Sequence, residues 1–260
     1  MKIIIINRPV IALLLSITVI TIILTGVYKD SQQSVYKDRE QWERLGDIVW
    51  EANIDEKAVA FTFDDGPSPT FTHKILDLLA KYNAKGSFFV IGQQAQIYPD
   101  IIKREYREGH EIGNHTYNHY EVTRLSGMEL EKDLALAHKA IYDITRVKMR
   151  LFRPTSGYYD KKIVRVAKSF NYRVVIWTWG QDSRDWTNIS GEKIALQIMK
   201  TIRPGSIVLF HDRGGDHSNT VKALEILLPV LKERGYQFVT VSTLLKIADK
   251  HRLKVIKKQN

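Results

Sequence analysis

The chain has 260 residues, of which 44% are hydrophobic, and 39 basic against 29 acidic side chains give it a net charge of +10. This length suits one domain of about 200 to 250 residues or two smaller ones, and the charge favours contact with polyanions without naming a partner. The chain contains no cysteine, which excludes disulfides, thiolate catalysis and cysteine-based zinc sites, so histidine and carboxylate side chains would have to hold any metal ion.

The first 27 residues differ from the rest of the chain. From Val10 to Val27 the sequence is apolar apart from hydroxyl groups and one glycine, and Lys2 and Arg8 lie on its N-terminal flank. About 20 apolar residues can span a bilayer, and a basic flank favours the cytoplasmic side. We therefore expect residues 1–27 to form an uncleaved single-pass transmembrane helix that contacts the membrane through residues 3–27. The rest of the chain would then be extracytoplasmic. A cleaved signal peptide is the alternative.

Residues 28–57 are polar and mixed in charge, and we expect a stalk with a short amphipathic helix around Trp42 to Val49. From 58 to 248, apolar runs of strand length alternate with segments of helical period, which is the pattern of repeated βα units. This predicts an α/β domain with a mostly parallel sheet or barrel. Residues 249–260 are rich in lysine and are expected to form a solvated basic tail.

Seven strands and seven helices are predicted in this domain, and the number of strands suggests one barrel. The helices are expected to begin where proline, glycine or hydroxyl residues give start signals. The strand candidates are Val59–Phe63, Ser87–Ile91, Glu111–Gly113, Arg150–Phe152, Arg173–Thr178, Ser206–Phe210 and Gln237–Val241. The helix starts are near Pro69, Pro99, Met128, Lys161, Gly191, Thr220 and Thr243.

Polar side chains follow several of the predicted strands. In a parallel βα barrel the carboxyl ends of all strands meet at one rim, where active sites are found. We therefore expect five separate segments to converge on one pocket. They are Asp64-Asp65, His115 to His119, Arg153, Asp182 to Trp186 and His211-Asp212.

The spacing of His115 and His119 indicates a metal site. Residues four apart lie on the same side of a helical turn, so both imidazoles can bind one ion. A third ligand is expected from Asp64 or Asp65, because adjacent side chains of a strand alternate and one carboxylate can bind metal while the other faces substrate. Three protein ligands leave one position open for water, which indicates catalysis. A solvated Asp-Asp-Gly turn is the alternative.

His211 ends an apolar strand and would lie at the same rim. An imidazole titrates near neutral pH and suits a general acid, while a structural histidine under a loop is the alternative. His217, in the loop that follows, is the other histidine of interest. The chain has no glycine-rich phosphate loop and no basic motif with interleaved aromatic residues, so no nucleic-acid partner is expected.

Taken together, these motifs resemble the polysaccharide deacetylase family, also called the NodB-homology carbohydrate esterases. The resemblance covers about Ala58 to Leu245 and implies an irregular (β/α)7-type barrel. Five motifs carry it in the family's order: Thr62-Phe63-Asp64-Asp65-Gly66, His115-Thr116-Tyr117-Asn118-His119, Arg153-Pro154, Asp182-Ser183-Arg184-Asp185-Trp186 and Leu209-Phe210-His211.

The resemblance also implies a role for each motif residue. Asp64 would be the catalytic base, paired with Arg153, and His211 would be the acid, tuned by Asp185. Three residues would hold one divalent ion, for which zinc is expected first and cobalt, nickel or manganese are open: Asp65, His115 and His119. Two residues would line the pocket for the acetyl methyl group: Trp186 and Leu209.

One motif departs from the family pattern. Where the family has Arg-Pro-Pro-Tyr-Gly, this chain has Arg153-Pro154-Thr155-Ser156-Gly157. In the family, the backbone N–H at the tyrosine position steadies the oxyanion. Ser156 keeps that N–H and loses the aromatic wall, so we expect activity to be retained with an altered substrate preference.

The expected activity is metal-dependent hydrolysis of the N-acetyl group of GlcNAc-type residues in a cell-wall glycan such as peptidoglycan. A membrane-tethered domain favours a wall substrate, and a monomer is expected. The alternatives are a deacetylase of chitin oligomers or of N-acetylmuramic acid, a xylan O-acetyl esterase, and a non-catalytic glycan-binding protein.

Overall fold

The computed structural model describes residues 17–18, 21 and 39–259. All but three residues of the expected membrane anchor, and residues 28–38 of the expected stalk, therefore lie outside the described residues. Within the described part of the chain, no helix combines the length and the apolar character needed to cross a bilayer. The chain divides into two compact units, Met1–Gly46 and Asp47–Asn260.

The described part of the first unit contains a helix over residues 39–45, in which Arg39 Nε lies 2.7 Å from Glu43 Oε1. The predicted helix around Trp42 to Val49 is therefore wrong at its C-terminal end. Ile48 and Val49 already belong to the second unit. They form strand β1, whose side chains are buried and which pairs with β6.

Eight strands of the second unit form one sheet in the order β1-β6-β5-β4-β3-β2-β7, and β8 pairs with the start of β2. Every strand pairing is parallel, so the predicted parallel α/β fold is confirmed. The strands are β1 (Ile48–Val49), β2 (Ala58–Asp64), β3 (Gly86–Val90), β4 (Glu111–Asn114), β5 (Leu151–Phe152), β6 (Arg173–Val175), β7 (Ile207–His211) and β8 (Gln237–Phe238).

The alternation of side chains along β2 explains how this strand serves both the core and the site. Successive side chains of a strand point to opposite faces. Phe61 and Phe63 pack against Phe210 of β7 on one face, with ring centroids 5.3 and 5.8 Å apart. Thr62 and Asp64 lie on the other face, which is the one that carries the functional groups described below.

An irregular segment completes the ring of strands. After β6 the chain leaves the ladder and residues 176–183 run beside β7, where the Thr178 amide donates to the Ile207 carbonyl (3.0 Å) and the Leu209 amide donates to the Gln181 carbonyl (2.9 Å). These bonds connect the last strand of the order back to the β6 end. The arrangement fits the expected (β/α)7-type barrel, and it ends β6 at Val175 rather than at the predicted Thr178.

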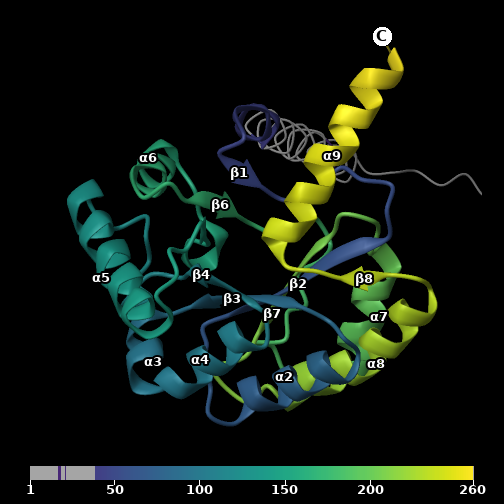
Figure 1. Cartoon of the computed structure of the whole chain (residues 1–260), viewed down its shortest axis with the longest axis horizontal. Coiled ribbons are helices and arrows are strands. Elements are labelled where there is room, and N and C mark those ends of the chain that lie inside the picture. Colours follow the sequence, from purple (N-terminus) through teal and green to yellow (C-terminus); the bar gives the residue numbers. More distant parts are fainter. Residues whose placement is uncertain (1–16, 19–20, 22–38, 260) are drawn as a thin grey trace, which may run out of the picture. The chain divides into compact units, whose positions relative to one another are not determined.

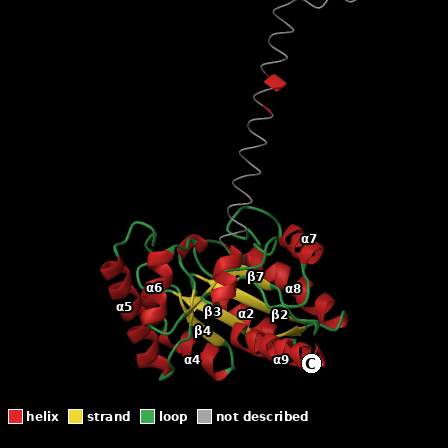
Figure 2. Cartoon of the chain, turned by 90° about the horizontal axis from the view of Figure 1, so that it is seen from above, coloured by secondary structure: helices red, strands yellow, loops and turns green. Residues whose placement is uncertain are grey.

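Helices flank the strands (Figures 1 and 2). A polar side chain caps several of their N-termini, as in α5, where Ser126 and Glu129 form a reciprocal capping box. Helix α3 was not predicted from the sequence. The helices are α2 (Phe71–Lys81), α3 (Gly92–Ile97), α4 (Pro99–Arg107), α5 (Gly127–Thr145), α6 (Lys161–Ser169), α7 (Gly191–Thr201), α8 (Ser218–Glu233) and α9 (Val241–Gln259), with a 3₁₀ turn η1 (Thr155–Gly157).

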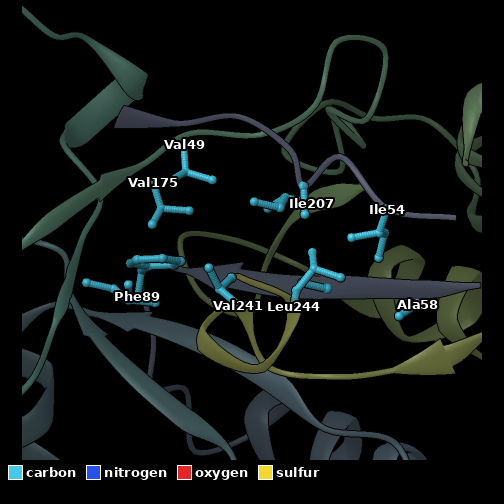
Figure 3. Packing of buried hydrophobic residues seen from close by; sticks show 11 residues of the cluster. Val49, Ile54, Ala58, Phe89, Val175, Ile207, Val241 and Leu244 are labelled. Atoms are coloured by element: carbon cyan, nitrogen blue, oxygen red, sulfur yellow. The ribbon is translucent and has the colours of Figure 1, made fainter. Parts of the chain in front are cut away.

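One cluster of the buried core gathers side chains from β1 and the loop after it, from β2, β3, β5, β6 and β7, and from α9 (Figure 3). Val241 and Leu244 are buried residues of α9 within this cluster.

The ends of the second unit differ from the prediction. Strand β8 ends at Phe238 and not at the predicted Val241, where helix α9 begins. Helix α9 runs to Gln259, so the residues expected to form a basic tail from 249 onward continue a helix. At the other end, the compact unit begins at Asp47, which places residues 47–57 in the fold and not in a stalk.

Candidate active site

Asp64 ends strand β2 and is 4% exposed. The fully buried Arg153, directly after β5, donates from Nη1 to Asp64 Oδ1 (2.7 Å) and to Thr62 Oγ1 (2.8 Å). Its other donors are fixed as well: Nε donates to the Val175 carbonyl and Nη2 to the Ile176 carbonyl, both at 3.0 Å. A buried carboxylate needs a paired charge, and this guanidinium supplies it while holding the carboxylate in one orientation.

Asp65, His115 and His119 each offer one atom of a compact group that could hold a metal ion. Asp65 Oδ1 lies 3.3 Å from His115 Nε2 and 3.1 Å from His119 Nε2. Ligands of a tetrahedral zinc ion stand about 2.0–2.1 Å from the metal, which puts any two of them about 3.3 Å apart. The side chains present therefore fit a divalent ion with three protein ligands.

The local backbone and neighbouring groups orient these ligands. A φ of +74° at Asp65 turns this side chain away from the alternation of β2, so the two adjacent carboxylates can serve different partners. His115 Nδ1 donates to the Arg153 carbonyl (2.7 Å), which leaves the lone pair on Nε2, the nitrogen nearest Asp65. Burial acts to raise the pKa of Asp65, but the nearby rings of His115 and His119 hold it well below its usual range.

The backbone that brings the two histidines together is not the helical turn that their spacing predicted. Residues 115–120 form a loop and no helical turn, with positive φ at Thr116 (+67°) and His119 (+58°). Asp133 of α5 fixes this loop by accepting from the Tyr117 amide (2.5 Å) and the Asn118 side chain (2.6 Å). The helical premise was wrong, although the imidazoles do converge.

His211 ends β7, next to Asp64 in the parallel register. Its Nδ1 donates to Asp185 Oδ1 (2.7 Å), and its backbone amide donates to Asp185 Oδ2 (2.8 Å). Burial lowers the pKa of His211, but the hydrogen bond and charge of Asp185 and the charges of Asp64 and Asp65 outweigh it and raise the pKa to about 9. The imidazole is therefore held as a cation at neutral pH.

A cavity of about 330 Å³ joins these groups. Arg153 and Asp185 are buried behind it and act on the groups that line it. The three residues expected from the sequence to contact substrate also line the cavity: Ser156 in η1, Trp186, which is 67% exposed, and Leu209 of β7. The cavity lining further includes Gly157, Trp177, Asp182, Arg213, Gly214 and His217.

The sequence analysis placed Asp212 among the converging segments without giving it a role, and it did not single out Glu105; both carboxyl groups are buried. Asp212 accepts a hydrogen bond from the Thr72 hydroxyl, and burial together with the charges of Asp65 and Asp64 outweighs that bond and raises the pKa of Asp212 to about 7. Glu105 of α4 is fully buried, and neither of its carboxyl oxygens has a hydrogen-bond partner. Its place directly after His211, where β7 ends, was the signal for the first. The amphipathic period of α4, which turns position 105 inward, was the signal for the second.

Comparison with known proteins agrees with this geometry. A sequence profile described as Polysaccharide deacetylase matches residues 51–175, which include Asp64, Asp65, His115, His119 and Arg153. A peptidoglycan-N-acetylglucosamine deacetylase of Bacillus cereus is 45% identical over 208 residues, which cover 80% of this chain and 97% of that protein. The chain belongs to the polysaccharide deacetylase family.

Solved structures show the same fold. A crystal structure of the peptidoglycan N-acetylglucosamine deacetylase Bc1960 matches with a TM-score of 0.75 and 32% identity, over 78% of this chain and 95% of that chain. A pseudoenzyme of the CE4 family from Bacillus anthracis matches with a TM-score of 0.72 and 28% identity, over 78% of this chain and 70% of that chain. The fold thus occurs with and without activity, so the argument for catalysis depends on the side chains.

Proposed function

We propose that this protein is a metal-dependent N-deacetylase that removes acetate from GlcNAc-type residues of a cell-wall polysaccharide, with peptidoglycan as the first candidate. The observation that carries the proposal is the convergence of two sets of groups on one cavity. One set is the possible metal site of Asp65, His115 and His119, and the other is the pair formed by Asp64 and His211. The name of the Bacillus cereus relative supports peptidoglycan as the substrate.

The metal site would provide a Lewis acid. Asp65, His115 and His119 would hold a divalent ion, with zinc as the first choice and cobalt, nickel or manganese as alternatives for these ligand types. When bound, the ion supplies positive charge that makes a nearby water more acidic and polarises the acetyl carbonyl. The chain's own residues would carry out the proton transfers.

Asp64 would act as the base that takes a proton from the attacking water. Its carboxylate is suited to this role because Arg153 binds only Oδ1 in hydrogen-bonding geometry and Asp64 also lines the cavity. The same bond keeps the carboxylate facing one way throughout the reaction. A base held in place by a buried partner loses little entropy when substrate binds.

His211 would protonate the leaving amine. Expulsion of an amide anion is prohibitive, so the departing nitrogen needs a proton, and Asp185 keeps His211 charged to deliver it. The Ser156 amide would support the oxyanion, and a donor of this kind contributes about 3 kcal/mol in enzymes where one has been removed. Trp186 and Leu209 would form the wall for the acetyl methyl group.

The cellular setting is part of the proposal. An N-terminal anchor over residues 3–27 would place the catalytic unit outside the cytoplasmic membrane, where a wall glycan is within reach. A monomer suffices for this chemistry, because every group in the proposed roles comes from one chain.

The decisive test is acetate release from purified peptidoglycan, in parallel with chitin oligomers, N-acetylmuramic acid glycans and O-acetylated xylan. We expect release from peptidoglycan that a chelator abolishes and added zinc or cobalt restores. Asp64→Asn should abolish turnover while leaving bound metal unchanged. Wild-type activity in that variant would show that Asp64 is not the base.

A non-catalytic glycan-binding protein is the second candidate, favoured by the likeness to a pseudoenzyme. Binding of peptidoglycan without any acetate release, at full metal occupancy, would establish it and exclude the deacetylase. The presence of two bonded pairs at one cavity, Asp64 with Arg153 and His211 with Asp185, supports the deacetylase instead.

A further inference from the structure

His217 lies beside His211 and has no role in the reaction proposed above. It precedes α8, is 2% exposed, and is among the residues of the cavity lining. Its ring stacks on that of His211, with centroids 6.3 Å apart and planes inclined by 26°, and it meets Phe71 edge-on at 5.9 Å. This position brings a second imidazole to the proposed general acid.

A chain of hydrogen bonds connects the two imidazoles through one carboxylate. The Thr220 hydroxyl donates to Asp185 Oδ2 (2.7 Å), so its only proton is used there. His217 Nδ1 lies 3.3 Å from the same hydroxyl oxygen, which can now only accept, so Nδ1 must carry the proton. The order is therefore His217 to Thr220 to Asp185, whose other oxygen accepts from His211 Nδ1.

The two oxygens of Asp185 are thus divided between two tasks. Oδ2 accepts from Thr220 and from the His211 backbone amide, while Oδ1 faces the His211 ring alone. Each donor on Oδ2 draws negative charge away from Oδ1. Since a carboxylate with less free charge holds a neighbouring proton less tightly, these donors make His211 a stronger acid than Asp185 alone would allow.

The charges around His217 favour its neutral form. Burial lowers the pKa of His217, and the His211 cation lowers it further, while Asp185, the Arg213 carbonyl and Asp65 act in the opposite direction without overcoming them. His217 Nε2 is buried and has no hydrogen-bond partner, which also suits a neutral ring. A neutral His217 donates through Nδ1 without competing with His211 for the charge of Asp185.

We propose that His217 is a positioning residue that acts through Thr220. It reduces the negative charge that Asp185 presents to His211, so that His211 can give up its proton to the leaving amine. The inference rests on the proposed function for its consequence in catalysis, but the contact itself can be tested without turnover.

The test measures the titration of the His211 ring by NMR in the full chain, with its signals assigned by their loss in His211→Gln. His217→Phe keeps a ring against Phe71 and His211 but removes the donor, and Thr220→Val removes the relay. We expect His217→Phe to raise the pKa of His211 by about half a pH unit, and Thr220→Val, which removes the bond to Asp185 itself, to raise it by at least as much. The double variant should show no rise beyond that of Thr220→Val alone, because His217 acts through Thr220.

Conservative variants and a remote control separate this role from packing. Thr220→Ser keeps the hydroxyl, and His217→Asn places an amide donor near the Nδ1 position, so both should restore the wild-type titration. His138→Phe, at a half-buried histidine that contacts Tyr172, should leave it unchanged. An unchanged pKa of His211 in His217→Phe would mean that His217 only packs. A lowered pKa would mean that Asp185 has moved, and either result overturns the inference.

Kinetics on a GlcNAc oligomer then connect the contact to the reaction. We expect His217→Phe to lower kcat about threefold at neutral pH with KM unchanged, and to move the alkaline limb of the profile upward by the same half unit. A change in KM alone would contradict a positioning role. If wild-type protein releases no acetate, the proposed function fails, while the NMR titration still decides the role of His217.

Discussion

At the scale of single residues, the site contains two buried carboxylates, and each is hydrogen-bonded to one basic side chain. Asp64 is bound by Arg153, and Asp185 is bound by His211. Burial would raise the pKa of Asp185, but its bonds to His211 and Thr220 hold it below the usual value, so it stays ionised. This pairing leads to a prediction about pH.

Because the pKa of His211 is raised to about 9, its protonated form persists above neutral pH and is lost only as the pH rises through that value. We expect kcat to fall on the alkaline side as His211 loses its proton. Asp185→Asn removes the main stabilising charge, so the alkaline limb should move down by more than one pH unit. Measured pH profiles of the two proteins check this, and coincident alkaline limbs would contradict it.

The metal ligands give a second prediction. His115→Ala and His119→Ala should each lose the ion as well as activity, since two remaining ligands bind a divalent cation weakly. Metal content of the purified variants measures this directly. His73→Ala, outside the site, serves as the matched control and should keep wild-type metal content. Full occupancy in His115→Ala would remove this residue from the ligand set.

Motif spacing was enough to predict which residues meet, but not how. His115 and His119 were assigned to a helical turn, whereas positive φ at Thr116 and His119 produces a loop. Such dihedrals are rare for residues with a Cβ, and local sequence gives little signal for them. Interactions over long sequence distances, such as the Thr72 to Asp212 bond, are likewise absent from any local pattern.

At the scale of elements, α4 contains a charge-bearing side chain on its buried face. Desolvation, with a contribution from the charge of Asp212, raises the pKa of Glu105 well above its ordinary value. The folded pKa is above the unfolded one, so the contribution of Glu105 to stability is complete below the unfolded pKa. It is lost as the pH rises toward the folded pKa.

We predict that Glu105→Met raises the thermal unfolding midpoint at pH 8 by a few degrees, because it removes a buried carboxyl group without partners. The gain should shrink as the pH falls toward 5. Glu131→Met, on the exposed face of α5, controls for the change in side chain and should have little effect. Calorimetry at the two pH values checks the difference, and a destabilised Glu105→Met at pH 8 would contradict it.

The long elements could be predicted because their periods are strong. β2 is a nearly continuous apolar run of strand length and α5 and α8 follow helical repeats, whereas β1 and β8 have only two residues each. Two residues cannot establish a period, and their pairing depends on strands far away in sequence. The same reason explains why α3, six residues long, was missed.

At the scale of the whole molecule, the barrel could be predicted from the alternation of strands and helices, but its closure could not. The segment 176–183 closes the ring by bonds to β7 without forming a regular strand. The N-terminal limit also depends on tertiary pairing: β1 joins β6, and the Ala52 amide donates to the Gly205 carbonyl (2.9 Å). Gly205 has a φ of +83°, and a Cβ there would lie 1.7 Å from the Ala52 carbonyl oxygen, so this approach requires glycine.

These contacts predict where the chain can be shortened. A fragment of residues 47–260 should unfold cooperatively, because it keeps the whole compact unit. A fragment of residues 58–260 loses β1 together with the buried Trp50 and Ile54, and it should be insoluble or unfold at a much lower temperature. Thermal unfolding of both fragments is the measurement. Equal midpoints would show that residues 47–57 contribute nothing to the fold.

Arg153 has a consequence for how this scaffold can change over time. One guanidinium binds the carboxylate of Asp64 and, at the same moment, two carbonyls of the chain at the end of β6. A substitution there would damage the architecture together with the chemistry. We therefore expect relatives that have lost catalytic activity to have lost exposed groups such as His119 first. They should retain Arg153, because the fold also depends on it.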